Sequence, residues 1–400
     1  MTQLAFTLPV KNGDTKWLGG VEGASSGWLI AQAASVQQGL SVVICKDTNS
    51  ALTLESEIKF FAADQNVQIL PFPDWETLPY DNFSPHQDII SSRLTSLHQL
   101  PQVKQGIIIV PVSTFMHRIA PYEFLSANTL LLSRGQVIDS DKLRHQLTQA
   151  GYRAVDNVFS HGEFAFRGSI IDLFPMGSEY PFRIDMFDDE VDSLRTFDPE
   201  TQRSIDKIEQ IRLLPAREFP LTDSAIGLFK RQWRERFDVN VKNCPTYQDV
   251  SNGFAPAGIE YYLPLFFDKT STLFDYLPKD SLIISEGALE SKCQEFWNDA
   301  SNRYEERRHD VERPILPPTQ LFLNANDFMG SLKAFKKLQF SQESVAGAGR
   351  SNLNCEAPPR LSVDAQSPQP LLALENHIAQ KVKSRVLFCA ESAGRREALL

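Results

Sequence analysis

A glycine- and serine-rich segment near the amino terminus has a spacing close to that of a nucleotide-binding loop. It reads GGVEGASSGW over residues 19–28 and stands directly before an apolar run. An active loop reads G-x-x-x-x-G-K-[S/T], because glycine N–H groups cradle the phosphates, the lysine reaches the β- and γ-phosphates and the hydroxyl holds Mg²⁺. The matching frame begins at Gly20. In it Ser25 replaces the second glycine, Ser26 the lysine and Gly27 the hydroxyl residue.

A second segment also lacks a residue that binding of a nucleoside triphosphate with Mg²⁺ requires. SLIISEGA, residues 281–288, has the form of an apolar strand that would end in Asp-Glu to hold the Mg²⁺ shell, but Ser285 stands in the Asp position beside Glu286. Two interpretations of the loop stay open: a structural turn without a ligand, and a site that binds phosphate or sulfate through N–H groups and the helix dipole. The sequence favours the first, and it predicts no cofactor, no metal and no catalytic residue. The residues of this degenerate loop are Gly20, Gly23, Ser25, Ser26 and Gly27.

The segment PFRIDMF, residues 181–187, is the candidate for a binding surface. Alternation with period two places Phe182, Ile184 and Met186 on one face, and Arg183, Asp185 and Phe187 on the other. If the apolar set faces the core, Phe187 lies on the outer face beside Arg183, and aromatic residues with arginine are typical of interface hot spots.

The strand that precedes this segment adds a third candidate residue. A turn centred near Ser178 would place Ser169 opposite Phe187 and bring Arg167 to the same surface. The alternative needs no partner: Phe187 packs under a neighbouring helix, and Arg183 pairs with Asp185 or Asp172.

Other groupings have simpler explanations. The acidic run FDDEVD, residues 187–192, has no paired histidine and is typical of a solvated strand end. The mixed charges of residues 303–313 are those of a helix with i,i+3 and i,i+4 ion pairs. Trp75, Tyr80 and Phe83 lie in a segment with four acidic residues and no Lys or Arg, so we expect packing and not stacking on DNA.

Composition limits the class of protein. The 400 residues carry a net charge of −10, which argues against a chain whose main task is to grip nucleic acid. The five cysteines form no C-x-x-C, which fits a reducing compartment without disulfides or a zinc site. Since no apolar run is long enough for a membrane span, we expect a cytoplasmic protein without a membrane partner.

The elements expected around these residues indicate an α/β protein. Helical and strand-like segments alternate up to about residue 125, and the apolar run Ile107–Val110 is typical of a strand buried on both faces. Residues 126–214 indicate a smaller α+β unit with a long hairpin whose turn is PMGSEYP. Longer helices and apolar strands return over residues 215–340. A linker is expected at 341–370, and 371–400 as the truncated start of a further domain.

Four segments, taken in order, resemble a known family. FPDWETLPYDNFSPHQDIISSRL, from residue 72, looks like the amino-terminal region of bacterial transcription-repair coupling factors. RGSIIDLFP with FRIDMFDDEVDSLRTFD resembles the second domain that this family shares with the excinuclease protein UvrB. GIEYYLPLF and LFDYLPKDSLIISEGALE are also similar to UvrB.

The resemblance implies a fold and a partner. Residues 1–125 and 215–340 would form one helicase-like parallel-sheet body, similar to that of UvrB, with the 126–214 domain inserted between them. In this family the second domain docks the damage-sensing excinuclease ATPase, UvrA, and the residues carried over are Arg167, Arg183 and Phe187. The loop at Gly20 would be a relic, since UvrB keeps the active residues there.

The resemblance also implies what lies outside the chain. Full-length members would bind RNA polymerase and double-stranded DNA and work as ATP-driven translocases through regions without counterpart here. Two alternatives to a recruitment role stay open: an NTP-dependent helicase or DNA-binding domain, and an autoinhibitory module for the missing motor.

Overall fold

The computed structural model describes residues 6–65, 67–287, 289–355, 359, 361–362, 366–380, 385–390 and 392–399. The chain divides into two units, residues 1–353 and 354–400. Each is described by itself below.

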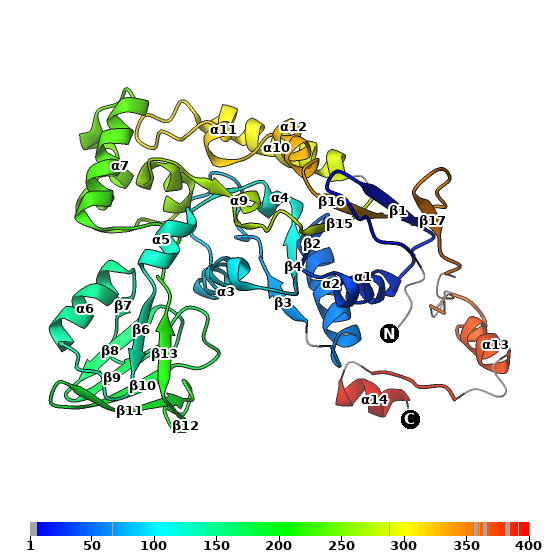
Figure 1. Cartoon of the computed structure of the whole chain (residues 1–400), viewed down its shortest axis with the longest axis horizontal. Coiled ribbons are helices and arrows are strands. Elements are labelled where there is room, and N and C mark those ends of the chain that lie inside the picture. The colour runs from blue at the N-terminus through cyan, green and yellow to red at the C-terminus, as the bar shows by residue number, and fades with distance from the viewer. Residues whose placement is uncertain are drawn as a thin grey trace. The chain divides into compact units, whose positions relative to one another are not determined.

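Seven parallel strands form the central sheet of the first unit, in the order β17-β1-β16-β15-β2-β4-β3 (Figure 1). The sheet is built from both ends of the unit, because four strands come from residues 15–111 and three from residues 282–352. The α/β fold with a parallel sheet is therefore confirmed. The strands are β1 (Thr15–Gly19), β2 (Leu40–Cys45), β3 (Gln68–Pro71), β4 (Gly106–Pro111), β15 (Leu282–Glu286), β16 (Lys336–Phe340) and β17 (Arg350–Asn352).

Both faces of this sheet are buried, since alternate residues of β2 and β4 enter two different hydrophobic cores. Val43 and Ile109 pack with helices α1 (Ser25–Val36) and α2 (Thr48–Phe61). Val42 and Ile108 belong to the larger core, which also contains residues of α3 (Gln87–Gln99). Continuous apolar runs are what a strand covered on both faces requires.

Side-chain acceptors set the starts of two helices. The carboxylate of Asp47 caps α2 by accepting a 2.8 Å hydrogen bond from the N–H of Ser50. Helix α3 begins at Gln87 after His86, whose ring nitrogen accepts a hydrogen bond from the N–H of Asp88.

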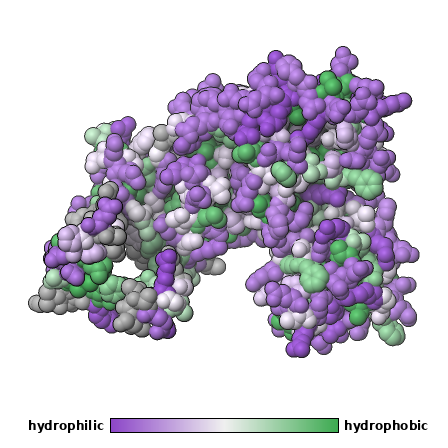
Figure 2. Space-filling view, turned by 180° about the vertical axis from the view of Figure 1, so that it is seen from behind, coloured by the Kyte–Doolittle hydropathy of each residue, from purple (hydrophilic) through white to green (hydrophobic). Residues whose placement is uncertain are grey.

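The second chain segment adds mostly helices. Among them α10 (Leu289–Arg307) carries the pairs Arg303–Asp299 and Arg308–Glu305, and the surface over it is hydrophilic (Figure 2). The predicted mixed-charge helix over 303–313 is wrong beyond Arg307, where a turn begins.

The remaining elements of the body come from both chain segments. They are α4 (Val112–Phe115), α5 (Tyr122–Ala127), α7 (Asp223–Arg236), α8 (Pro245–Ser251), α9 (Leu273–Tyr276), α11 (Pro318–Leu321), α12 (Ala325–Leu332), the 3₁₀ segments Leu100–Gln102, Val241–Asn243 and Ile259–Phe266, and the pair β5 (Arg118–Ile119) and β14 (Ser271–Thr272).

A second sheet occupies the inserted part of the chain (Figure 1). Its order is β12-β11-β10-β9-β8-β7, and only β7 and β8 are parallel. Helix α6 (Ser140–Gln149) and the antiparallel pair β6 (Leu130–Ser133) and β13 (Gln210–Leu213) accompany it. The strands are β7 (Arg153–Ala154), β8 (Glu163–Arg167), β9 (Ile170–Leu173), β10 (Phe182–Phe187), β11 (Glu190–Phe197) and β12 (Ser204–Ile208).

The expected long hairpin is instead a four-stranded meander, β8 to β11. Each of its two arms folds back on itself, at Gly168 and at Asp188, and both residues have positive φ (60° and 52°). Glycine adopts that conformation without steric cost and Asp tolerates it, which explains the two tight turns.

Polar contacts, of which those to Glu218 are buried, lie where the inserted part joins the body. Arg93 of α3 has no exposed side-chain surface, and its Nε donates to Oε1 of Glu218 at 2.7 Å. The indole N–H of Trp75 donates to the other oxygen of Glu218 at 2.9 Å. On the other side of the junction, His161 contacts Asp88 of α3 at 2.7 Å. We call these five side chains the seam.

Strand β17 lies inside the segment 341–370 that the sequence predicts as a linker, and its pairing with β1 makes residues 350–352 part of the sheet. The second unit contains α13 (Leu372–Gln380) and α14 (Ala393–Leu399). Part of the predicted linker and of the predicted domain start lies outside the described residues. No helix in the described part of the chain is both long and apolar enough to cross a membrane.

Candidate functional site

Phe187 stands at the end of β10, and its side chain is 74% exposed. Ile184 and Met186 of the same strand are buried, as the alternation predicts. We call the opposite face of the sheet, which carries Arg183, Asp185 and Phe187, the outer face.

The register of β10 against β9 differs from the predicted one. Phe182 pairs with Leu173 and Asp185 with Ile170, and the N–H of Met186 donates to the carbonyl of Ser169. Ser169 therefore lies beside Met186 and not opposite Phe187. The loop between β9 and β10 is centred between Gly177 and Ser178, which moves the pairing by one residue relative to a hairpin centred at Ser178.

A buried carboxylate organises the arginines of the outer face. Asp172 has no exposed side-chain surface and accepts hydrogen bonds from Nε and Nη2 of Arg183 at 2.7 and 2.9 Å, and a further one from Arg167. The Arg183 guanidinium also lies 4.7 Å from the ring centre of Phe197. We call Asp172, Arg167 and Arg183 the Asp172 network.

The two arginines of this network differ in exposure. The side chain of Arg183 is 16% exposed, and its hydrogen bonds to Asp172 raise its pKa above the ordinary value. The side chain of Arg167 is 42% exposed, so more of its guanidinium faces solvent. The alternative that paired Arg183 with Asp172 is thus what the structure contains, whereas Phe187 does not pack under a helix.

Asp185 separates Arg183 from Phe187 along β10. It pairs with Arg195 of β11 and accepts a 2.5 Å hydrogen bond from Ser193. The acidic residue between the two candidates is therefore neutralised within the sheet, and the surface beside Phe187 is not dominated by its charge.

A residue that the sequence analysis missed lies near Phe187. Phe187 pairs with Glu190 of β11, and Glu190 forms a bridge with Val137. Directly paired residues project from the same face of a sheet, so Phe187, Glu190 and Val137 form a row. Val137 is 73% exposed. Its only signal in the sequence is an isolated apolar residue in a polar loop, which is common at any surface.

Three backbone N–H groups in the segment of the degenerate loop have hydrogen-bond partners within the chain. The N–H of Gly20 donates to the carbonyl of Glu343 at 3.3 Å, that of Val21 to the carbonyl of Ser341 at 3.0 Å, and that of Glu22 to Ser25 Oγ at 3.0 Å. Gly23 has positive φ in the turn that follows. Ser26 is buried and lines a cavity of about 1000 Å³. Ser285 is buried in β15, and Glu286 is at the end of that strand on the same cavity.

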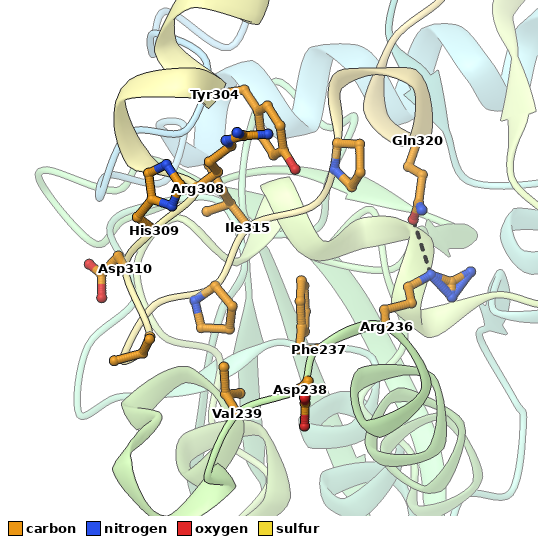
Figure 3. Close-up of a pocket in the computed structure, with 13 residues that line it drawn as sticks. Arg236, Phe237, Asp238, Val239, Tyr304, Arg308, His309, Asp310, Ile315 and Gln320 are labelled. Atoms are coloured by element: carbon orange, nitrogen blue, oxygen red, sulfur yellow. Dashed lines mark hydrogen bonds between the residues drawn. The ribbon is translucent and has the colours of Figure 1, made fainter.

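Another cavity, of about 560 Å³, lies between the ends of α7 and α10 (Figure 3). Its charged side chains turn to separate partners: Arg236 donates to Gln320 at 3.0 Å and Arg308 pairs with Glu305. These side chains converge on no common centre. Among the described residues no three His, Cys, Asp or Glu side chains gather as metal ligands would.

The three aromatic residues for which the sequence predicts a packing role differ in exposure. Trp75 and Tyr80 are buried, which agrees with the expected packing role, and Tyr80 OH donates to the carbonyl of Leu316 at 2.9 Å. Phe83 is exposed. A single exposed ring among acidic neighbours is not the stacking platform that single strands need.

Comparison with known proteins agrees with this architecture. Residues 130–219 match the UvrB interaction domain and residues 379–400 match the MFD, D3 domain. The transcription-repair-coupling factor of Escherichia coli (strain K12) is 47% identical over 399 residues, which are 99% of this chain and 34% of that protein. Those of Haemophilus influenzae and Myxococcus xanthus are 45% and 28% identical over 98% and 85% of this chain, and 34% and 29% of their own lengths.

The chain thus spans about a third of the length of these relatives. The matched interaction domain includes the whole outer face, from Val137 to Arg195. The chain is therefore homologous, along nearly its whole length, to a part of the transcription-repair-coupling factors, and it carries their UvrB interaction domain.

Proposed function

We propose that this chain recruits nucleotide-excision repair by docking the excinuclease protein UvrA on the outer face of the inserted sheet. The observation that carries the proposal is the exposure of Phe187 on a strand whose Ile184 and Met186 are buried, within the matched UvrB interaction domain. A strand gains little for its own folding by exposing a phenylalanine, and aromatic anchors are typical of interface hot spots.

The roles of the site residues follow from their contacts. Phe187 is the anchor, and Val137 widens the apolar contact on the other side of Glu190. Arg167 also donates to Asp172 and to Asn157, but its side chain is 42% exposed, so it can meet acidic groups of the partner with the rest of its guanidinium. Arg183 is a positioning residue, because its donors already bind Asp172 and it holds β10 against β9.

The test is binding to purified UvrA by the wild type and by Phe187→Ala, with the melting temperature of each measured in parallel. We expect weaker binding with an unchanged melting temperature. Wild-type binding that Phe187→Ala leaves intact would move the docking site away from this face.

We also propose that the chain itself hydrolyses no nucleoside triphosphate. Ser26, Gly27 and Ser285 stand where lysine, hydroxyl and aspartate would be needed for that chemistry. The ATP-driven translocation of DNA and the contact with RNA polymerase are proposed for longer relatives, through regions beyond this match. An ATPase assay of the chain with and without DNA tests the first statement, and turnover above that of a Glu286→Ala control would contradict it.

A further inference from the structure

Glu57 of α2 lies against the first turn of α1. The backbone N–H of Gly27 faces its carboxylate and acts to lower the pKa of that group. A Cβ atom placed on Gly27 would be 2.4 Å from Cβ of Glu57 and 2.9 Å from its Oε2. Gly27 is the third residue of α1, so its N–H is one of those that a helix leaves without an internal partner.

In a phosphate-binding loop this end of the helix holds the anion, since its free N–H groups and the helix dipole favour negative charge. Here a carboxylate of the same chain lies against one of those N–H groups, and the donors of Gly20, Val21 and Glu22 have partners within the chain. We propose that Glu57 is the internal ligand of this helix end, in the place of a phosphate, and that it closes the cleft to nucleotide phosphates.

The absence of a side chain at position 27 is part of the arrangement. Any side chain there, including the Ser or Thr of an active loop, would meet the Cβ of Glu57 well inside contact distance. Cβ of Glu57 is fixed by the backbone of α2, so the conflict could be relieved only by moving the helix. Position 27 therefore has no hydroxyl side chain for the same reason that Glu57 lies so close to it: the two helices pack there without room for any side chain.

The charges around the neighbouring cavity act in the same direction. Glu57, Glu286, Glu343 and Asp47 line it, together with Lys46. Burial and the charge of Glu286 raise the pKa of Glu57, and the Gly27 N–H partly offsets this rise. A polyphosphate entering the cavity would meet like charges where an active loop presents a lysine.

The first experiment measures pyrophosphate binding by calorimetry, with the wild type, Glu57→Ala and Glu55→Ala. Glu55 is the control because it is on the same helix and pairs with Lys59 instead. We expect binding at least tenfold stronger for Glu57→Ala than for the other two. Equal binding by the wild type and Glu57→Ala would overturn the proposal, since no internal ligand would then be competing.

A second experiment tests the contact itself and does not require any variant to bind pyrophosphate. In protein labelled with ¹⁵N at its 20 glycines, we expect the Gly27 amide resonance to shift as the Glu57 carboxyl titrates. Glu57→Gln should abolish the shift, and Glu55→Gln should preserve it. A Gly27 resonance whose pH response survives Glu57→Gln would show that the carboxylate is not its partner. Neither result depends on docking at the inserted sheet, so the two proposals fail separately.

Discussion

Asp172 binds Arg183 through both of its carboxylate oxygens, at 2.7 and 2.9 Å, in a position where the carboxylate has no exposed surface. The pair joins β9 to β10 directly behind the exposed part of the outer face. Loss of Arg183 would therefore act on the fold as well as on a partner, and the two effects must be measured separately.

Arg183→Ala should lower the free energy of unfolding by about 3 kcal/mol, because it leaves a buried carboxylate with only Arg167 as its charged partner. Urea denaturation of the isolated chain measures this. Arg134→Ala is the matched control, since Arg134 forms a long, exposed pair with Glu209 and should cost less than about 1 kcal/mol. Equal stability of the two variants would show that the Asp172 network contributes little to the fold.

Phe187→Ala should weaken binding to UvrA by about 2 kcal/mol, or roughly 30-fold, with an unchanged melting temperature. Phe159 is a suitable control, because it is 56% exposed in the same inserted part and belongs to the loop before β8. We expect Phe159→Ala to bind as the wild type does. If both variants lose affinity equally, exposed aromatic area and not this site would explain the binding.

Val137→Asp should also reduce affinity, since it places a charge in the row that begins at Phe187. In a double-mutant cycle, Val137→Ala and Phe187→Ala should couple by about 0.5 kcal/mol or more, as expected for residues that meet one partner surface together. The measurement is the dissociation constant of the four proteins at one salt concentration. Strict additivity would place Val137 outside the contact.

Alanine at Gly27 should have the opposite effect on stability from alanine at Gly227. Both glycines are inside helices, where Ala is normally better by about 1 kcal/mol. A Cβ at Gly227 meets nothing within 4 Å, whereas one at Gly27 meets Glu57 at 2.4 Å. We expect Gly227→Ala to raise the melting temperature and Gly27→Ala to lower it, and a rise in both would contradict the close contact of α1 and α2.

Stability should depend on pH through Glu260, which is buried and accepts a 2.8 Å hydrogen bond from Ser84. Burial raises the pKa of Glu260 to about 7, above its value in the unfolded chain. The folded state therefore holds the proton more tightly, and this stabilisation is complete below about pH 4.5 and lost as the pH rises through 7.

The measurement is the free energy of unfolding at pH 5 and pH 8, for the wild type and Glu260→Gln. The wild type should lose up to about 3 kcal/mol more than the variant between the two pH values. The amide keeps the size of the carboxyl group and does not titrate. Parallel pH profiles would mean that Glu260 is ionised in the folded chain throughout.

The order of apolar and polar residues along the chain correctly predicted the features that depend only on local periodicity, such as which face of a strand is buried. Alternation in residues 182–187 was enough to place Phe187 outside and Ile184 inside, because strand geometry is regular over six residues. The continuous apolar run Ile107–Val110 likewise predicted a strand buried on both faces.

Contacts between residues that are far apart in the chain could not be predicted from the sequence alone. Asp172 was one of two acidic residues within reach of Arg183, and only the register of β9 and β10 decides between them. The one-residue difference at Ser169 arose from the loop between β9 and β10, whose exact centre has no periodic signal. The contact of Glu57 with Gly27 depends on the packing of two helices and the glycine between them, and a pattern of polar and apolar residues does not contain that information.

The seam described above has a mechanical consequence. Arg93 and Trp75 belong to the body, Glu218 directly follows the inserted sheet, and the charges that join them are buried. A hinge requires groups that can exchange partners with water, and Arg93 and Glu218 cannot do so without exposing an ionised pair in a core, although Asp88 of the seam is 62% exposed. A force applied at Phe187 by a bound partner should therefore be transmitted through the seam to α3 and the parallel sheet. We expect the inserted part to move with the body as one rigid piece and not to bend against it.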